Sequence, residues 1–333
     1  MEDPQSALFD DAPEHAGVLP APASSELVDL AGALRERWGG RLHLGTSSWH
    51  FPGWQGLVWR HAHPEAALSR SGLAAYAAHP LLACVSLDRA FYRPLPAGQY
   101  AALARQVPPH FRFVVKAPAQ VSDALLRAHG SGAPLRDNPL FLDAHAAVDD
   151  CARAAAQGLG ERLGALVFQL SPLPPRWLDD EAGLLGRLDA MLDAVAAALP
   201  AGALLAVEPR DASLLTPALA AVLKRHRARC CLGLHDRLPA IEELLPLQRA
   251  LWPGDLVCRW NLQRGLRYEQ ARDSWAPFDR LRSPDLPTRR TLARVARATL
   301  DAGHRVFVTI NNKPEGSAPL SVLELARELL GAA

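Results

Sequence analysis

The chain has 333 residues, of which 49% are hydrophobic and 21% charged, and its formal net charge is +1. This composition is typical of a globular protein with an ample core, and it excludes a disordered or fibrous chain. No charge-free apolar run reaches the roughly 18 residues that predict a membrane span. Residues 1–14 are acidic and lack the apolar core of a signal peptide. We therefore expect a cytoplasmic protein without membrane contact.

Charge is unevenly distributed along the chain. Residues 1–26 contain six acidic residues and neither lysine nor arginine. The remaining chain therefore has 36 basic against 29 acidic residues, a net charge of +7. An excess of this size weakly favours an anionic partner, and it is also compatible with a well-solvated surface.

The cysteines exclude two kinds of structural cross-link. Their number is odd and no C-x-x-C spacing occurs (Cys84, Cys151, Cys230, Cys231 and Cys258). A disulfide framework or a structural zinc site is therefore not expected. We expect buried, reduced thiols, and neither a metal nor a cofactor.

The first 40 residues divide into two parts. Residues 1–23 are rich in proline, alanine and acids, and predict a disordered acidic tail. Residues 24–40 predict a helix that begins at a serine cap, has apolar residues at helical spacing and ends at Gly39-Gly40. Such a helix could cover the bottom of a barrel.

Residues 41–333 predict a single domain in which strands and helices alternate. Eight apolar runs predict strands, at 41–47, 82–88, 111–117, 164–170, 203–208, 229–235, 255–261 and 304–311. Helices are expected at 68–78, 97–106, 138–158, 180–199, 216–226, 241–250, 288–302 and 318–330. Eight alternations predict an α/β fold of the (β/α)8 TIM-barrel type rather than an open doubly wound sheet. The longest loops follow the first, third and seventh strands, where lids are expected.

Several blocks of this region resemble a known family. They are GTSSWHFPGW at 45–54, AFYR at 90–93, FRFVVKAP at 111–118, LGALVFQLSP at 163–172 and VEPR at 207–210, followed by NN at 311–312. In order and spacing they resemble the domain-of-unknown-function-72 family, also called YecE-like, over about residues 41–330. The resemblance implies a TIM-type barrel and no established activity.

The chain departs from the family pattern at three places. Ser48 stands where a second glycine is usual. The second block usually reads Val-Glu-Ile-Asn, and here Ser86 replaces the glutamate, so that carboxylate is missing or displaced to Asp88. The seventh strand usually ends in Arg-x-His-Gly, and here Arg259 is followed two residues later by Asn261. The resemblance therefore identifies a divergent member.

The candidate site lies where the strands end. In a barrel the carboxyl ends of all strands meet at one mouth, so residues far apart in the sequence become neighbours. The candidates for catalysis are Glu208, Lys116, Asp88 and His235. The candidates for substrate binding are Arg210, Arg259, Gln169, Asn261, Asn311, Tyr92, Trp49 and Ser47.

Glu208 is the leading candidate for a general acid or base. It ends an apolar run and has cations nearby, which can tune the protonation of a carboxylate. The alternative is a structural bridge from Glu208 to Arg210 or Arg259. A retaining glycosidase would need a second carboxylate about 5 Å away, for which Asp88 and Asp236 are candidates.

Lys116 has three open roles. It could bind a phosphate or carboxylate as a point charge, pair with Glu208 to close the barrel top, or form a Schiff base. Arg210 and Arg259 are expected near the same mouth. Anion binding is therefore the simplest interpretation.

Two further candidates have structural alternatives. His235 and Asp236 could act as a base with its carboxylate, but adjacent strand residues point to opposite faces and are not expected to touch. Trp49 belongs to an aromatic-rich loop that either stacks on a ligand or folds onto the barrel.

Two functions remain in view. The first is an enzyme, with hydrolase and lyase chemistry both open, whose barrel mouth binds a small anionic or polyhydroxylated substrate. The second is an inactive binding protein, including a nucleic-acid-associated one, that uses the barrel as a scaffold. Its motivation is the net charge of +7 and the basic clusters at 224–229 and 280–297. We favour the first, because polar groups follow every predicted strand. The oligomeric state is not indicated.

Overall fold

The computed structural model describes residues 17–128, 132–236 and 238–331. Within these ranges, nine parallel strand segments form one sheet in the order β8-β7-β6-β3-β2-β1-β11-β10-β9. Their bounds are β1 (Leu42–Thr46), β2 (Cys84–Leu87), β3 (Arg112–Lys116), β6 (Leu163–Gln169), β7 (Leu204–Glu208), β8 (Arg229–Cys230), β9 (Leu232–Leu234), β10 (Leu256–Trp260) and β11 (Val306–Ile310).

The sheet closes into a barrel because its two ends belong to one stretch of chain. β8 ends at Cys230 and β9 begins at Leu232, so residues 229–234 are one strand interrupted at Cys231. β8 pairs with β7 and β9 pairs with β10, while the Cys231 amide donates to the Val207 carbonyl at 2.8 Å. The eight strands that the sequence predicts are therefore confirmed, as is the TIM-type fold.

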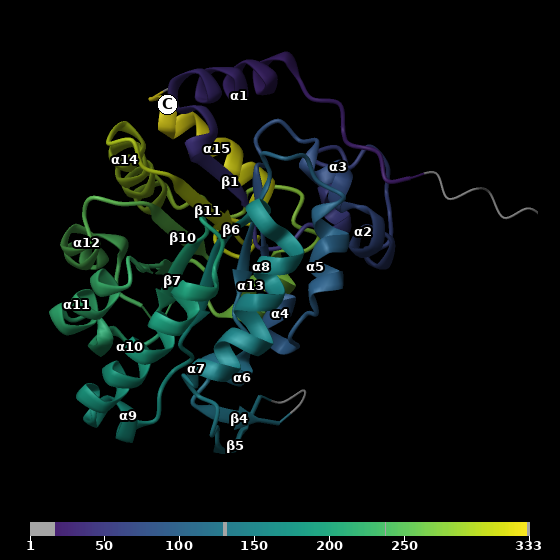
Figure 1. Cartoon of the computed structure of the whole chain (residues 1–333). Coiled ribbons are helices and arrows are strands. Elements are labelled where there is room, and N and C mark those ends of the chain that lie inside the picture. The colour runs from purple at the N-terminus through teal and green to yellow at the C-terminus, as the bar shows by residue number, and fades with distance from the viewer. Residues whose placement is uncertain (1–16, 129–131, 237, 332–333) are drawn as a thin grey trace, which may run out of the picture.

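Helices surround the barrel (Figure 1). Those between successive barrel strands include α2 (Glu65–Ser71), α3 (Leu73–Ala77), α5 (Ala97–Ala104), α7 (Ala144–Ala147), α8 (Arg153–Leu159), α10 (Glu181–Ala198), α11 (Pro217–Arg225), α12 (Ile241–Ala250) and α14 (Leu286–Asp301), and α15 (Ala318–Leu330) follows β11. Every predicted helical segment is present. Two are interrupted, one at Gly72 between α2 and α3 and one by a π turn, Val148–Ala152, between α7 and α8.

The predicted N-terminal helix is α1 (Ser25–Trp38), and Ser24 caps it by accepting the Leu27 amide at 3.2 Å. It covers the amino-terminal end of the barrel, at the top of Figure 1, where its Ala31 lines a cavity together with His43 of β1. Residues 1–16 of the predicted tail lie outside the described residues. Within residues 17–23, Ala21 donates its amide to the Val58 carbonyl at 2.9 Å.

Short helices and one pair of short strands lie in the loops at the carboxyl end of the barrel. They are α4 (Arg89–Tyr92), α6 (Ala119–Ser122), the antiparallel pair β4 (Leu125–Arg127) and β5 (Pro134–Asp137), α9 (Pro175–Asp179) and α13 (Tyr268–Trp275). The sequence did not predict them, because elements this short show little periodicity. The β4–β5 pair and α13 occupy two of the long loops in which lids are expected.

The barrel interior changes from apolar to charged along the strands. In the part of the barrel nearer the amino-terminal ends of the strands, inward-pointing apolar residues pack together: Val114, Ala165, Val167, Leu204, Ala206, Cys231, Val257 and Phe307. Outward-pointing residues such as Leu166 and Val207 pack against the helices. Two residues further along their strands, the inward positions hold Lys116, Glu208 and Arg259. The strand pleat therefore delivers these charges to the mouth.

All five cysteines are buried and free of disulfides, as the sequence predicts. Of the helices that the structure describes, none is long and apolar enough to cross a membrane. The described ranges also hold no group of three or more His, Cys, Asp or Glu side chains placed to bind a metal.

Candidate functional site

An ionic triad spans the carboxyl end of the barrel, with Arg259 of β10 at its centre. Arg259 Nη1 lies 2.5 Å from Oε2 of Glu208, which ends β7. Arg259 Nη2 lies 2.7 Å from Oδ1 of Asp88, which follows β2. Glu208 is fully buried and Arg259 is 2% exposed, whereas a third of the Asp88 side chain remains exposed. The triad therefore joins strands from opposite parts of the sheet.

Arg210 and Gln169 extend this network. Arg210 Nη2 lies 2.6 Å from Oε1 of Glu208, an ion pair without hydrogen-bond alignment. The same nitrogen donates to Gln169 Oε1 at 2.8 Å, and Arg259 makes a longer hydrogen bond of 3.3 Å to that oxygen. Glu208 therefore has one guanidinium group at each carboxylate oxygen. The sequence offered Arg210 or Arg259 as structural partners of Glu208, and the structure pairs it with both.

These contacts set the ionisation of the triad. Burial would raise the pKa of Glu208, but the guanidinium groups of Arg210 and Arg259 outweigh it and lower the pKa. The pKa of Asp88 is likewise lowered, because Arg259 and Lys116 outweigh burial. Burial opposes the charge on Arg259, yet the two carboxylates raise its pKa. All three groups are therefore ionised near neutral pH.

Lys116 ends β3 beside the triad but joins none of its ion pairs. The residue is 8% exposed, and its Nζ lies 3.4 Å from the centre of the Phe91 ring, a cation–π contact. Within the described residues no carboxylate pairs with this ammonium. The ion pair with Glu208 that the sequence offered as one alternative does not form, because arginines occupy both Glu208 oxygens.

The surroundings of Lys116 disfavour its charge. Burial has the largest effect and Arg259 and Arg210 add to it, while Asp88 and Glu208 act in the opposite direction. Together they lower the pKa of Lys116 to about 7. Protonated and neutral forms of the amine therefore coexist near neutral pH.

A second lysine at the mouth escaped the sequence analysis. Lys313, 6% exposed, follows β11, and its Nζ donates to Asn311 Oδ1 at 3.1 Å. The same Nζ lies 4.1 Å from the Tyr268 ring of α13. Burial and the charge of Arg272 lower the pKa of Lys313 to about 8. The sequence contains one indication of this residue: Lys313 directly follows Asn311-Asn312, the polar pair at the end of the predicted eighth strand.

Three predicted binding residues lie around a small pocket of about 230 Å³, lined by Ser47, Trp49 and Tyr92 among others. Ser47 Oγ accepts a 2.7 Å hydrogen bond from Asn311 Nδ2. Tyr92 is 85% exposed and can reach a ligand. Trp49 is buried and donates to the Leu68 carbonyl at 3.1 Å, so it folds its loop onto the barrel, the second of the two alternatives considered.

His235 Nδ1 and Asp236 Oδ1 are in contact, which corrects the expectation that the two residues would not touch. β9 ends at Leu234, so the two residues lie beyond the pleat and strand alternation does not separate them. They line a larger pocket of about 650 Å³ together with Gln169 and Arg210. Tyr268 of α13 also borders this pocket.

The order of the strands places Lys116 between the two mouth pockets. β3, which Lys116 ends, lies between β2 and β6. Asp88, after β2, lines the smaller pocket, and Gln169, at the end of β6, lines the larger one.

Asn261, the remaining predicted residue, has a buried Nδ2 without a hydrogen-bond partner among the described residues. The predicted strand-end residues therefore gather around one mouth.

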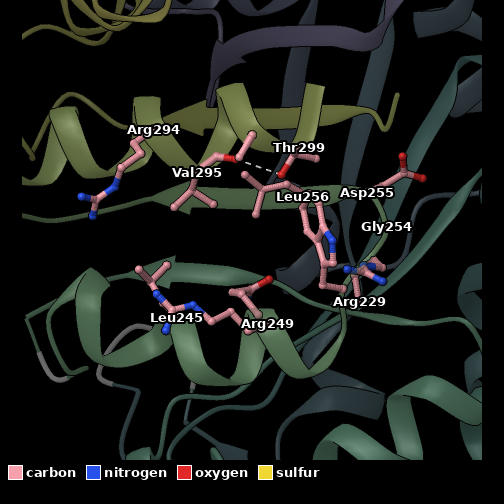
Figure 2. Close-up of a pocket in the computed structure, with 12 residues that line it drawn as sticks. Arg229, Leu245, Arg249, Gly254, Asp255, Leu256, Arg294, Val295 and Thr299 are labelled. Atoms are coloured by element: carbon pink, nitrogen blue, oxygen red, sulfur yellow. Dashed lines mark hydrogen bonds between the residues drawn. The ribbon is translucent and has the colours of Figure 1, made fainter. Parts of the chain in front are cut away.

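A separate cavity of about 420 Å³ lies on the flank of the barrel, between α12 and α14 (Figure 2). Its lining includes apolar residues and three arginines: Leu245, Leu256, Val295, Arg229, Arg249 and Arg294. Leu256 and Arg229 begin their strands, so this cavity lies toward the amino-terminal end of the barrel. It shares no lining residue with the two mouth pockets.

The profile of the family described as "Protein of unknown function DUF72" matches residues 43–332. The chain belongs to the DUF72 family. A DUF72 protein of Enterococcus faecalis V583 is 17% identical, with a TM-score of 0.58 over 87% of this chain and 95% of that one. A DUF72 protein of Thermotoga maritima MSB8 is 18% identical, with a TM-score of 0.54 over 87% and 99%. At this identity they share the fold alone. No curated protein matches the chain.

The resemblance to DUF72 proteins is thus confirmed, and the structure shows how one departure from the pattern is accommodated. Ser86, which stands in place of the usual glutamate, donates its hydroxyl to Asp88 Oδ1 at 2.6 Å. Asp88 in turn pairs with Arg259. Arg259, in the seventh strand, therefore pairs with a carboxylate that directly follows the second strand.

Proposed function

We propose that this DUF72 protein is an enzyme that binds a small anionic substrate at the carboxyl-terminal mouth of its barrel. One observation carries the proposal. Arg259 and Arg210 engage the carboxylates of Asp88 and Glu208, which leaves the Lys116 ammonium without a counter-ion in the described residues. A buried cation without a counter-ion is costly, and an anion from solution would relieve that cost.

The rest of the mouth supports the same assignment. Six cationic side chains and four carboxylates line or adjoin the two mouth pockets, an excess that favours an anion (Lys116, Arg210, Arg259, Lys313, Arg89 and Arg267 against Asp88, Glu208, Asp236 and Glu269). Amide groups of Gln169, Asn261 and Asn311 supply neutral donors and acceptors. These amides suit the hydroxyl or carbonyl oxygens of a polyhydroxylated anion.

The geometry changes the roles proposed for two residues. Glu208 was the sequence-based candidate for proton transfer, but two guanidinium groups keep it ionised and unable to donate a proton near neutral pH. We propose that Glu208 instead positions Arg210. Arg259, a candidate for substrate binding, has both terminal nitrogens paired and is buried, so we assign it a structural role. Lys116, with a pKa of about 7, and Lys313, with a pKa of about 8, are groups at this site that titrate near neutrality.

Anion binding can be measured by isothermal titration calorimetry with inorganic phosphate and with pyruvate at low ionic strength. We expect the wild-type protein to bind, and Lys116→Met and Arg210→Met each to weaken binding by at least about tenfold. A charge-assisted hydrogen bond contributes about 1.5–3 kcal/mol, and 1.4 kcal/mol corresponds to a factor of ten.

The matched control is Lys224→Met, because Lys224 is exposed on α11, away from the mouth. Its affinity for either anion should equal that of the wild type. Two results would contradict the proposal: a folded wild-type protein that binds neither anion, or an equal loss of affinity in the Lys224 variant.

The nucleic-acid alternative has less support from the geometry. Trp49, Trp54 and Trp59, which might have stacked on bases, are buried at 3% exposure or less. In the basic helix α14, Arg297 donates to the carbonyl of Glu328 at 2.6 Å. A salt titration separates the two functions, because contacts to many phosphates make affinity fall steeply with salt.

A further inference from the structure

Lysine is rare in this protein. Of the 36 lysine and arginine residues, only three are lysines: Lys116, Lys224 and Lys313. Lys224 is exposed, and the other two are the buried amines of the barrel mouth. Arginine holds carboxylates and phosphates at least as well as lysine, because its fork donates two parallel hydrogen bonds. What arginine cannot do is lose its proton at ordinary pH.

We propose that the amine of Lys116 forms a Schiff base with the carbonyl group of a small anionic substrate, a carbonyl compound that also bears a carboxylate or a phosphate. This inference rests on the proposed anion site and names the class of substrate for it. A lysine serves this chemistry because its neutral amine is a nucleophile. Arg210 would hold the anionic group, while Arg259 would keep Glu208 and Asp88 in place.

The environment of Lys116 is that of a nucleophilic amine. An ion pair with a carboxylate would keep the amine protonated, and the described residues provide none. The Phe91 ring, whose centre lies 3.4 Å from the Lys116 Nζ, covers the amine in place of a counter-ion; its face attracts the ammonium form and so acts against the effect of burial. The pKa of Lys116 is lowered to about 7 by burial, Arg259 and Arg210 against the opposing effect of Asp88 and Glu208, so roughly half of the amine is neutral at pH 7.

The covalent step needs no oxidant or reductant. The lone pair of the neutral Lys116 nitrogen attacks the carbonyl carbon, a C–N bond forms, and the electrons of the C=O π bond move to oxygen. Nitrogen loses a proton and oxygen gains one, which gives a carbinolamine. A general acid then protonates the hydroxyl group, water leaves, and the nitrogen lone pair forms the C=N bond of the iminium ion.

We assign Lys313 the role of the acid that supplies the proton leaving with water. Its pKa, lowered to about 8, suits proton donation near neutral pH. The charge of Asp88 opposes the lowering of the pKa of both Lys313 and Lys116.

The test is reductive trapping of the full-length protein. The protein is incubated at pH 7 with sodium cyanoborohydride and either pyruvate or dihydroxyacetone phosphate, and the adduct is located by peptide mass spectrometry. We expect the adduct on Lys116 and not on Lys224. At pH 7 the neutral fraction of an amine with a pKa near 7 exceeds that of an exposed lysine by roughly 10³-fold.

Lys116→Arg is the decisive variant, since it retains a cation for anion binding and removes the nucleophile. We expect it to bind phosphate and form no adduct, while Lys224→Met is labelled as the wild type is. Adduct formation by Lys116→Arg, or labelling of Lys224 as fast as Lys116, would overturn the inference. Phosphate binding without any adduct in the wild type would also overturn it and leave the anion site standing. Loss of both would refute the two proposals together.

Discussion

Replacing Arg259 by methionine is expected to lower the free energy of unfolding by about 3–5 kcal/mol, because it removes one partner of buried ion pairs. The substitution leaves Glu208 fully buried with a guanidinium at one oxygen only, and it leaves Asp88 without its ion-pair partner. Urea denaturation followed by circular dichroism measures the change. The methionine chain fills much of the arginine volume, so the loss reports charge more than cavity formation.

The control is Arg105→Met, an exposed arginine next to the end of α5, for which we expect a change within about 0.5 kcal/mol. A loss below about 1 kcal/mol in the Arg259 variant would mean that the triad is not what holds β2, β7 and β10 together at the mouth. An Arg259 variant that fails to fold while the Arg105 variant folds normally would agree with the prediction.

Replacing Lys116 by methionine is expected to stabilise the protein at pH 6, by an amount on the order of 3–5 kcal/mol. The pKa of Lys116 is lowered from 10.5 to about 7 in the folded protein. Below pH 7 the amine is protonated in both states, so the folded state bears the full cost of the buried charge. Methionine removes that cost while occupying similar space.

The lowered pKa of Lys116 also predicts how the free energy of unfolding changes with pH. Between pH 7 and pH 10.5 the unfolded chain binds the Lys116 proton and the folded protein does not, so wild-type stability rises with pH over this window. The advantage of Lys116→Met should therefore shrink to roughly 2 kcal/mol at pH 9. Parallel denaturation of Lys224→Met, whose side chain is exposed, should show no such trend. A Lys116 variant that is less stable than the wild type at pH 6 would refute a lowered pKa.

The barrel could be predicted because its strands are buried on both faces and so appear as unbroken apolar runs. Runs such as 203–208 and 304–311 contain the observed β7 and β11 to within a few residues. The short elements could not be predicted in this way. The β4–β5 pair is exposed along most of its length, so no apolar pattern marks it.

The candidate site was predictable in place but not in its contacts. The positions of Glu208, Arg259 and Lys116 at strand ends predicted that they lie at one mouth. Which cation pairs with which carboxylate depends on side-chain geometry, which the sequence does not show. Two arginines pair with the two oxygens of Glu208, and none of the described carboxylates pairs with Lys116. Phe91 was overlooked because an aromatic residue after a strand usually indicates packing. Lys313 was overlooked because it follows the strand end by three residues.

The central claim is that the mouth holds an anion at Lys116 and Arg210. Crystals of the protein soaked in selenate, an anomalous scatterer that mimics phosphate, test it most directly. We expect an anomalous peak within hydrogen-bond distance of Lys116 Nζ and the Arg210 guanidinium, and no such peak in Lys116→Met crystals. An empty mouth, with selenate bound only at the arginines of the flank cavity such as Arg229 and Arg249, would contradict the claim.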